Sequence, residues 1–385
     1  MAHTLFITFG TRPEAIKMAP VVLELRRRER FRVVTCLTGQ HREMLDQVVE
    51  GFSLPIDHDL NIMRQRQSLG HITSAVLDGI DPLLEAEKPD LVMVHGDTTT
   101  TFAAALAAYY RMVPVAHVEA GLRTDNIYSP FPEEMNRRLA DRLADIYYAP
   151  TAAARKALLA EGASPERIVV TGNTVIDALL ATASTPAPPW ETKLARALER
   201  PGPKVLVTVH RRESWGTPME RVAQAIKRVS EQSPKITFLF PIHLNPAVRD
   251  VFRGALDTVR QVVFTEPLPY RSFVHLMKAA DVVITDSGGI QEEAPTLGKP
   301  VLVMRDTTER PEGIEAGTAR LVGTDGDVIA RELLLLLTDR SAYERMANAV
   351  NPYGDGHAAE RIADHLEYRF GLRTTPPADF SGYTP

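Results

Sequence analysis

The chain has 385 residues, of which 44% are apolar and 24% charged, a composition typical of a globular protein with a buried core. At roughly 150 residues per domain, this length favours two or three domains. The 44 Lys and Arg against 49 Asp and Glu give a net charge of −5, which argues against a nucleic-acid partner. A single cysteine, Cys36, excludes a disulfide framework and a site with several thiolate ligands.

The sequence predicts neither a membrane span nor an N-terminal secretion signal. No apolar stretch reaches the roughly 18 residues of a membrane-spanning helix. The start, MAHTLFITFGTRPE, leads into a strand pattern without the basic and apolar segments of a secretion signal. We therefore expect a soluble cytoplasmic protein without a membrane partner. Residues 371–385 are rich in Pro, Gly and Thr, and we expect them to be disordered.

In the first half, short apolar runs alternate with longer helical patterns. The runs predict buried parallel strands at 5–9, 33–37, 91–95, 113–118, 146–149 and 168–170. The longer patterns predict helices at 13–28, 42–52, 68–86 and 99–111. This alternation is typical of a doubly wound parallel sheet.

The second half repeats the alternation. Clustered prolines at 184–190 (STPAPPW) predict a linker, because proline interrupts both helices and central strands. Strands are then predicted at 204–209, 237–240, 262–264, 282–285 and 301–304, and helices at 219–230, 270–279 and 289–297. The sequence therefore predicts two similar α/β halves. Because ligands of such sheets bind beyond the carboxyl ends of the strands, the residues that follow each strand are the candidates for a functional site.

The first predicted strand is followed by GTRPE at 10–14, with Lys17 one turn later. Glycine permits a tight turn, and Pro13 suits the first turn of a helix. The free N–H groups of a helix start attract an anion, and Arg12 and Lys17 add positive charge. The alternative is an ordinary strand-to-helix turn with solvated charges.

Three acidic residues of the first half follow strands or a loop: Asp97 in HGDTTTT, Glu119 in EAGLR and Glu133 in FPEE. If they converge, they suit general acid–base chemistry. Two simpler interpretations compete with this hypothesis. Asp97 also suits the cap of the next helix. Glu133 also suits the first turn of a helix, where the dipole favours a carboxylate.

In the second half, His210, Arg211 and Arg212 follow a strand, and such a cluster suits a diphosphate. We do not expect a metal site, because His210 and His243 lack a convincing ligand spacing.

The segment DSGGIQEE at 286–293 is the most informative one. A Ser-Gly-Gly turn that opens a helix presents main-chain N–H groups to phosphate. An acid would repel phosphate, so Glu293 is better suited to sugar hydroxyls. Arg305 and Arg310 follow the strand at 301–304. The leading hypothesis is a nucleotide diphosphate in a cleft between two domains.

Long motifs then carry a resemblance to a known family. GTRPEAIKMAP, TGQHREMLDQV, VHGDTTTT, HVEAGLRT, FPEEMNRR, TGNTVIDAL, HRRES, DSGGIQEEAPTLGKPVLVMRDTTERPE and NPYGDGHAAERI resemble the non-hydrolysing UDP-N-acetylglucosamine 2-epimerases. The resemblance implies a GT-B fold of two Rossmann-like, doubly wound domains with the active site in the interdomain cleft. It implies an N-terminal domain at 1–172, joined by a C-terminal helix at 356–370, and a UDP-binding domain at 173–355.

The resemblance also implies a reaction, the reversible C2 epimerisation of UDP-GlcNAc to UDP-ManNAc. Loss of the C2 proton and elimination of UDP give 2-acetamidoglucal, and UDP adds back after C2 is reprotonated on the other face. This isomerase chemistry needs neither a cofactor nor a metal. It needs a closed cleft, because water would let the intermediates escape. A homodimer and a role in cell-surface polysaccharide biosynthesis are further implications.

Site residues are carried over from the resemblance position by position. The residues implicated in catalysis are Asp97, Glu119, Glu133 and His210, with the order of proton removal and return left open. The substrate-binding residues are Arg12, Lys17, Asp97, Glu119, His210, Phe273, Ser287, Gly288, Gly289, Glu293 and Arg310. A second UDP-GlcNAc, an allosteric activator, is bound by Gln40, His41, Arg66, Gln67, Glu133 and Arg211. Leu268 departs from relatives with an amide there, so any uracil contact at this position uses the main chain.

Three alternatives compete with this hypothesis. A hydrolysing epimerase would release ManNAc and UDP, but GTRPEAIKMAP and the complete activator set favour the non-hydrolysing type. A GT-B glycosyltransferase shares the fold but does not account for the three acids of the first domain. A catalytically inactive sugar-nucleotide sensor would not need those acids, and turnover distinguishes it from an enzyme.

Overall fold

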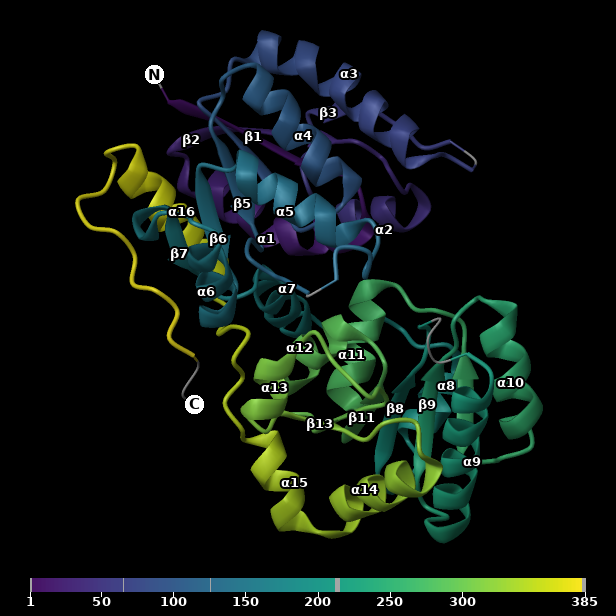
Figure 1. Cartoon of the computed structure of the whole chain (residues 1–385). Coiled ribbons are helices and arrows are strands. Elements are labelled where there is room, and N and C mark those ends of the chain that lie inside the picture. Colours follow the sequence, from purple (N-terminus) through teal and green to yellow (C-terminus); the bar gives the residue numbers. More distant parts are fainter. Residues whose placement is uncertain (1, 65, 125, 212–214, 383–385) are drawn as a thin grey trace. The chain divides into compact units, whose positions relative to one another are not determined.

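The computed structural model describes residues 2–64, 66–124, 126–211 and 215–382, without the side chains of residues 43 and 44. The chain forms two compact units (Figure 1). Unit 1 comprises Met1–Ala178 and Gly354–Gly382, and unit 2 is built on Leu179–Tyr353. In the part of the chain that is described, no helix combines the length and apolar character needed to cross a membrane.

Unit 1 is a 7-stranded parallel sheet in the order β3-β2-β1-β4-β5-β6-β7, covered by helices. Its strands are β1 (His3–Phe9), β2 (Phe31–Leu37), β3 (His58–Asp59), β4 (Leu91–His95), β5 (Val115–Val118), β6 (Ile146–Ala149) and β7 (Ile168–Val170). Its helices are α1 (Arg12–Arg28), α2 (Glu43–Gly51), α3 (Leu69–Glu87), α4 (Thr99–Tyr110), α5 (Glu133–Leu143), α6 (Ala152–Ala160) and α16 (Ala358–Arg369).

Unit 2 repeats the design with a 6-stranded sheet in the order β10-β9-β8-β11-β12-β13. Its strands are β8 (Lys204–Thr208), β9 (Thr237–Pro241), β10 (Val262–Thr265), β11 (Val282–Thr285), β12 (Val301–Val303) and β13 (Ala319–Leu321). Its helices are α8 (Thr192–Leu198), α9 (Thr217–Gln232), α10 (Pro246–Leu256), α11 (Tyr270–Ala279), α12 (Gly288–Thr296), α13 (Pro311–Glu315), α14 (Gly326–Thr338) and α15 (Arg340–Ala347). In each sheet the chain starts at the centre, builds to one edge and then returns to build the other. The predicted pair of Rossmann-like domains is therefore confirmed.

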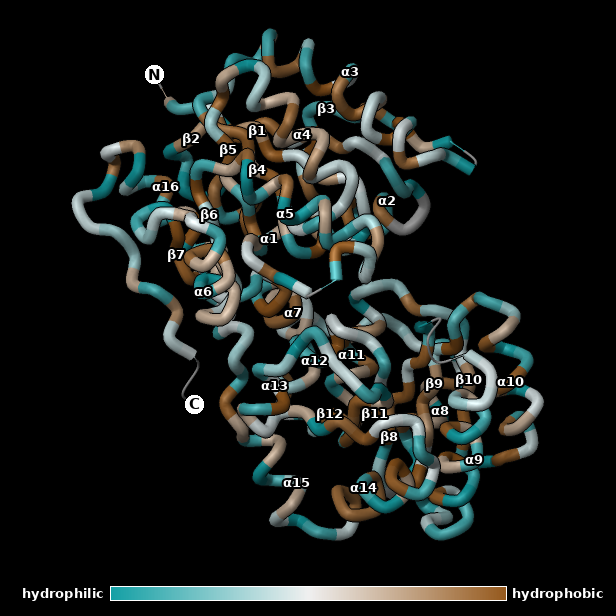
Figure 2. The backbone as a smooth tube through the Cα atoms, viewed as in Figure 1, coloured by the Kyte–Doolittle hydropathy of each residue, from teal (hydrophilic) through white to brown (hydrophobic). Residues whose placement is uncertain are grey.

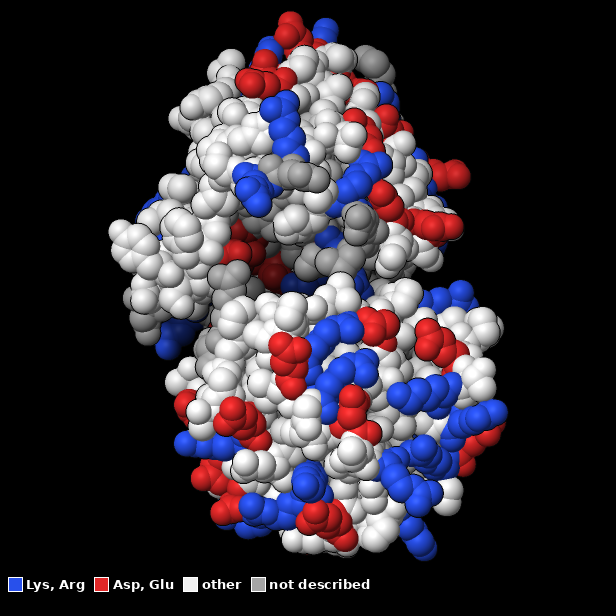
Figure 3. Space-filling view, turned by 90° about the vertical axis from the view of Figure 1, so that its right-hand side faces the viewer, with Lys and Arg blue, Asp and Glu red and all other residues white. Residues whose placement is uncertain are grey.

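Most strands of both sheets are mainly apolar and lie in the two cores, whereas the edge strands β3 and β13 do not (Figure 2). A parallel sheet has helices on both faces, so residues pointing to either face are buried, and strand sequences are continuous apolar runs. Phe6 and Val92 in unit 1, and Phe238 and Ile284 in unit 2, are fully buried. The side of the chain that Figure 3 shows carries interspersed Lys, Arg, Asp and Glu.

The predicted strands all exist, but the sequence analysis missed β3 and β13. β3 has two residues, and it exists through pairing of His58 with Cys36 and Asp59 with Leu37. β13 carries an exposed Arg320 at its centre and lies at the sheet edge. Neither segment has an apolar run, because each depends on a neighbouring strand rather than on its own burial.

The chain passes from unit 1 to unit 2 inside helix α7 (Thr174–Ala183). Asp177 in this helix accepts hydrogen bonds from the N–H of Ala359 at 2.8 Å and of Ala358 at 3.3 Å, and so caps α16. The segment 184–190 is irregular, as predicted, but it lies within unit 2. Its interpretation as a linker between the domains is therefore wrong.

The C-terminal segment is also more ordered than predicted for 371–385. Phe380 is 6% exposed, and its N–H donates to the carbonyl of Val170 at 2.7 Å. The carboxylate of Asp379 accepts the N–H of Val170 at 2.9 Å. These bonds attach residues 379 and 380 to β7, the edge strand of the unit 1 sheet, so the prediction of disorder is wrong for these two residues. Residues 383–385 lie outside the described part.

Two glycines of unit 1 allow a matched test of backbone and packing constraints. Gly121 has φ +88°, and a Cβ there would lie 2.4 Å from the carbonyl oxygen of Ala154. Gly162 has φ +90° with no atom within 4 Å of such a Cβ. We expect Gly162→Ala to lower the free energy of unfolding by about 1–2 kcal/mol through its left-handed backbone. Gly121→Ala should lose a further ~1–3 kcal/mol through steric overlap. Urea unfolding measures both, and equal losses would contradict the packing argument.

Candidate functional site

In both units the residues predicted for the site follow central strands of the sheet. β1 and β4 are neighbours in unit 1, and β8 and β11 are neighbours in unit 2. At these positions the direction of sheet growth reverses, so the carboxyl ends of the two strands border a crevice. Asp97 follows β4 in unit 1, and Ser287 follows β11 in unit 2.

Unit 1 has a cavity of about 490 Å³ at this edge. The residues of the sequence prediction that line it are Lys17, Gln40, His41, Gln67, Asp97, Glu119 and Glu133. The fold thus brings the three acids together with four of the residues assigned to the activator. Of the site residues predicted in unit 1, Arg12 and Arg66 lie outside this lining.

Glu119 lies in the turn after β5 and has φ 64°. A left-handed backbone is uncommon for a residue with a side chain and is found most often at functional sites. Its Oε2 accepts a hydrogen bond from Nδ2 of Asn173 at 2.9 Å and forms an ion pair with Nζ of Lys17. The Glu119 side chain is 8% exposed, so these partners hold a buried carboxylate in one position.

Asp97 is not the cap of α4. The side chain of Thr98 accepts the N–H of Thr101 at 3.1 Å and fills that role. The Asp97 carboxylate instead forms an ion pair with Arg137, and its carbonyl accepts a hydrogen bond from Asn136 at 3.0 Å. The capping interpretation of Asp97 is therefore wrong, and its carboxylate is oriented from α5.

Glu133 is the first residue of α5 and lines the cavity. Its neighbour Glu134 is fully buried and accepts hydrogen bonds from Arg138 at 2.7 Å and from the N–H of Thr124 at 3.1 Å. The two adjacent acids therefore have different roles, one structural and one in the cavity. Glu134 anchors the loop, while Glu133 combines the favourable position at the helix start with access to the cavity.

The start of α1 differs from the prediction of free N–H groups. The N–H groups of Gly10 and Thr11 donate to Oε2 of Glu14 at 3.0 and 2.8 Å. Burial raises the pKa of the Glu14 carboxyl, although the hydrogen bonds from Thr98, Gly10 and Thr11 act to lower it. An anion therefore does not find these two donors free. The Thr-x-x-Glu spacing of a capping box was the available signal.

His117 is a buried residue that the sequence analysis missed. Its Nδ1 lies 2.6 Å from Oδ1 of Asp141, and its Nε2 lies 2.7 Å from the carbonyl oxygen of Gly96. Both partners offer an oxygen to the ring, so the ring is held from both sides. Burial tends to raise the pKa of Asp141, but His117 and Arg123 lower it overall. His117 thereby holds the turn that presents Asp97. It lies inside an apolar strand, and although the motif HVEAGLRT begins with it, nothing in the sequence assigned it a role apart from the core.

His95, at the end of β4, was missed for the same reason. It lines the cavity and is 2% exposed. In the described part of the chain, neither ring nitrogen has a hydrogen-bond partner. Its Nε2 lies 3.8 Å from Oε2 of Glu119. Burial lowers the pKa of His95 to about 3, so the ring is neutral.

In unit 2, Asp286 orients the predicted diphosphate cluster. This buried carboxylate accepts the N–H groups of His210 and Arg211, each at 2.9 Å, and lies 2.9 Å from Nδ1 of His210. Burial tends to raise the pKa of Asp286, and the hydrogen bond from His210 is the main effect that lowers it. The His210 ring is thus fixed at the carboxyl edge of the sheet. Arg212, also predicted here, lies outside the described residues.

Ser287, Gly288 and Gly289 form the start of α12, as a phosphate site requires. A Cβ on Gly288 would lie 3.0 Å from Oε1 of Glu309, so glycine fits this position. Glu309 forms ion pairs with Arg211 and Arg305. Despite its burial, these arginines lower the pKa of Glu309 to about 2.

The other predicted residues of unit 2 lie along α11, α12 and the start of α13. Oε1 of Glu293 accepts a hydrogen bond from the Tyr270 hydroxyl at 3.2 Å. Arg310 forms an ion pair with Glu292. Phe273 is half-buried and packs against the core of unit 2. These contacts give each side chain a defined position.

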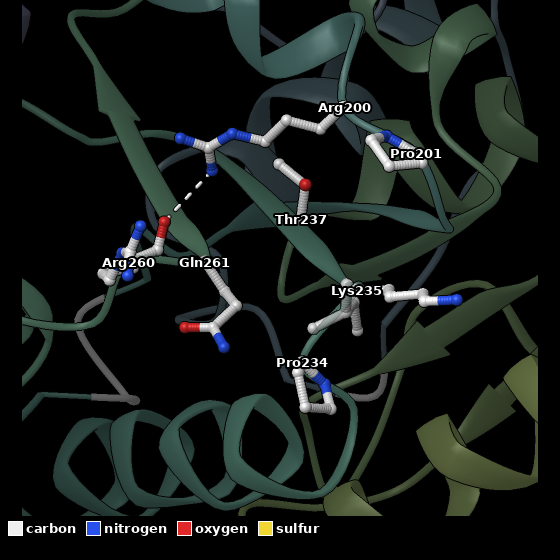
Figure 4. A pocket seen from close by; sticks show the side chains of 8 residues that line it. Arg200, Pro201, Pro234, Lys235, Thr237, Arg260 and Gln261 are labelled. Carbon is white, nitrogen blue, oxygen red and sulfur yellow. Dashed lines mark hydrogen bonds between the residues drawn. The ribbon is translucent and has the colours of Figure 1, made fainter.

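A second cavity, of about 470 Å³, lies in unit 2 at the opposite edge of its sheet (Figure 4). Its lining includes Thr237, at the start of β9, and Gln261, just before β10. Arg200 crosses it and donates to the carbonyl of Arg260 at 3.0 Å (Figure 4). The amino edge of a parallel sheet is not where such folds bind their ligands. Within the described ranges, no group of three or more His, Cys, Asp or Glu is placed to hold a metal ion.

Comparison with known proteins extends over both units. The family model for UDP-N-acetylglucosamine 2-epimerase matches residues 23–367. The chain is 48% identical over 376 residues to the UDP-N-acetylglucosamine 2-epimerase of Bacillus subtilis (strain 168), covering 97% of each chain. It is 50% identical over 364 residues to that of Escherichia coli (strain K12), covering 93% of this chain and 97% of the relative.

A solved structure agrees. UDP-GlcNAc 2-epimerase from Neisseria meningitidis bound to UDP-GlcNAc is similar with a TM-score of 0.85 and 46% identity, covering 94% of this chain and 99% of that one. The predicted GT-B class of two Rossmann-like domains is thereby confirmed. The position of the active site in an interdomain cleft stays a prediction.

The contacts of His117 predict a large cost for its removal. His117→Leu removes one of the two charged partners of the buried Asp141 carboxylate, with Arg123 remaining, and it also removes the partner of the Gly96 carbonyl. We expect a loss of about 2–4 kcal/mol in the free energy of unfolding. His58 is the matched control, because its ring lies 2.8 Å from Glu87 but is 28% exposed. His58→Leu should cost less than about 1 kcal/mol. Thermal and urea unfolding measure the difference, and similar losses would show that His117 is ordinary core.

Proposed function

The chain belongs to the UDP-N-acetylglucosamine 2-epimerase family, and we propose that it is a non-hydrolysing member that interconverts UDP-GlcNAc and UDP-ManNAc. One observation carries this proposal: Asp97, Glu119 and Glu133 line a single cavity at the carboxyl edge of the unit 1 sheet. Epimerisation needs groups that remove and return a proton on opposite faces of C2, and several carboxylates around one cavity meet that need.

In the proposed reaction, one carboxylate takes the C2 proton of the sugar. The electron pair of the C2–H bond forms a C1=C2 double bond while the C1–O bond to UDP breaks. The products of this step are 2-acetamidoglucal and UDP. A carboxylic acid then protonates C2 from the other face, and UDP adds back to C1. The assignment of Asp97, Glu119 and Glu133 to these transfers is part of the proposal, and no metal or cofactor enters it.

UDP is assigned to the groups at the carboxyl edge of unit 2 and to cations of unit 1. The start of α12 at Ser287, Gly288 and Gly289 offers main-chain N–H groups to phosphate. Glu293 is assigned to the ribose hydroxyls and Phe273 to the uracil region. The cations assigned to the negative charge of the leaving diphosphate are Arg12, Lys17, His210 and Arg310.

We further propose that UDP-GlcNAc activates the enzyme from a second site. Gln40, His41 and Gln67 line the same cavity as the acids, and Glu133 belongs to both sets. Arg66 and Arg211 complete the proposed activator residues. A homodimer in the cytoplasm, working in cell-surface polysaccharide biosynthesis, completes the proposal.

Proton NMR in heavy water tests the reaction directly. Incubation of UDP-GlcNAc with the enzyme should produce UDP-ManNAc that carries deuterium at C2, because the proton returned comes from a group that exchanges with solvent. Free ManNAc with UDP would instead show the hydrolysing type. No change in either sugar nucleotide would overturn the proposal and favour a glycosyltransferase or a sensor.

Asp97→Asn is the accompanying variant. If the Asp97 carboxylate transfers a proton, the amide should lower the rate of deuterium incorporation at least about 100-fold, the usual size of a general acid–base contribution. Turnover close to that of the unchanged enzyme would remove Asp97 from the proton transfers.

Activation makes a separate kinetic prediction. With UDP-ManNAc as the only substrate, the initial rate should be low and should rise when a small amount of UDP-GlcNAc is added. Gln67→Ala should weaken this response, because Gln67 is assigned to the activator alone. A hyperbolic UDP-ManNAc curve that added UDP-GlcNAc leaves unchanged would refute the second site without affecting the proposed reaction.

A further inference from the structure

We propose that His95 is a positioning residue for Glu119: its neutral imidazole takes over the Glu119 carboxylate when Lys17 turns to the diphosphate of the bound nucleotide sugar. The proposal rests on the proposed function, because it concerns the acids of the same cavity. It assigns to His95 a role that the motifs do not indicate.

The His95 ring lies so close to Glu119 that a small movement of either side chain would form a hydrogen bond between them. Its Nε2 lies 3.8 Å from Oε2 of Glu119, too far for a hydrogen bond but with little room for another group between them. That oxygen is already engaged by Nζ of Lys17 and by Nδ2 of Asn173. In this state the ammonium, rather than the imidazole, holds the carboxylate.

The His95 imidazole destabilises the folded state in its present position. Both ring nitrogens are buried, and neither has a hydrogen-bond partner among the described residues. A buried polar group without a partner destabilises the fold, so native proteins rarely keep one without a reason. A partner gained only in another state of the cavity supplies that reason. Glu119 is the acceptor nearest to Nε2 for which the structure gives a distance.

An exchange of partners changes the chemistry of Glu119. An ammonium stabilises a carboxylate through its full charge and so weakens it as a base. A neutral N–H donor orients the same oxygen with a smaller effect on its basicity. Lys17 also lines the cavity, and a bound diphosphate offers it a stronger partner than one carboxylate. Substrate binding would therefore free Glu119 from the ammonium and leave His95, together with Asn173, to hold it.

The charged neighbours of His95 are compatible with a neutral ring. Glu119 favours its protonation, while Lys17 and His117 oppose it. Burial is the largest influence and lowers the pKa of His95 to about 3. The ring therefore stays neutral over the ordinary working range of pH, and it can donate a hydrogen bond without adding positive charge to the site.

The test compares His95→Leu, His95→Gln and the control His71→Leu in the full-length enzyme. Leu removes the donor, while the Gln amide nitrogen can replace Nε2. His71 also has a buried Nε2 without a described partner, but it does not line the cavity. The measurements are kcat and KM for epimerisation, the pH profile of kcat, and the melting temperature.

We expect His95→Leu to lower kcat about 10- to 100-fold with little change in KM, as for the loss of one hydrogen bond to a carboxylate. The acid limb of the kcat profile should move to higher pH, because a lost donor disfavours the charged carboxylate. The melting temperature should not fall, since Leu replaces an unpaired imidazole. His95→Gln should restore kcat and the acid limb, and His71→Leu should change neither.

Two results would overturn the proposal: an unchanged kcat and acid limb in His95→Leu, or a loss of kcat with a lower melting temperature that His95→Gln does not restore. If His95→Leu does not fold, His95→Gln is compared with His95→Asn, because the shorter Asn amide does not reach Glu119. Equal activity of these two variants would also overturn the proposal. Activity of the unchanged enzyme is measured first, so that failure of the proposed function is recognised separately.

Discussion

The reversal of strand order at the centre of each sheet is the constraint on which the rest of the structure depends. β1 and β4 in unit 1, and β8 and β11 in unit 2, are adjacent strands whose following helices start on opposite sides of the sheet. The helices that follow these strands diverge and leave space at the carboxyl ends. Asp97 follows β4, Glu119 follows β5 and Glu133 begins α5, so all three acids are held by packed elements while they face the cavity at this edge.

The position of the carboxylates at this edge explains why each of them has a charged partner in unit 1. A carboxylate at a buried edge is destabilised unless a cation or several donors accompany it. Glu119 has Lys17 and Asn173, Asp97 has Arg137, and Asp141 has His117 and Arg123. The partners come from α1, α5, β5 and the loops that follow β5 and β7, so the acids are oriented by many elements of the unit. The site is therefore a property of the packed domain rather than of its motifs alone.

The sequence predicts the architecture well, because burial on both faces gives strands that are apolar throughout. It fails where a segment depends on its neighbours. β3 and β13 exist through pairing with β2 and β12. Phe380 is held by Val170, far away in sequence. A Pro- and Gly-rich composition indicated disorder but says nothing of such a partner.

The same limit applies to the site. Strand-end motifs identified Asp97, Glu119 and Glu133, because their residue types are unusual after an apolar run. His95 and His117 belong to the runs themselves, and a histidine in a strand has no distinguishing pattern. Only the contacts separate them: His117 has two acceptors, whereas His95 has no partner for either nitrogen in the described chain. His117 thus has hydrogen-bond partners for both ring nitrogens, and it stabilises the arrangement that the structure shows. The other is left unsatisfied, and an unsatisfied buried group favours any rearrangement that supplies its partner.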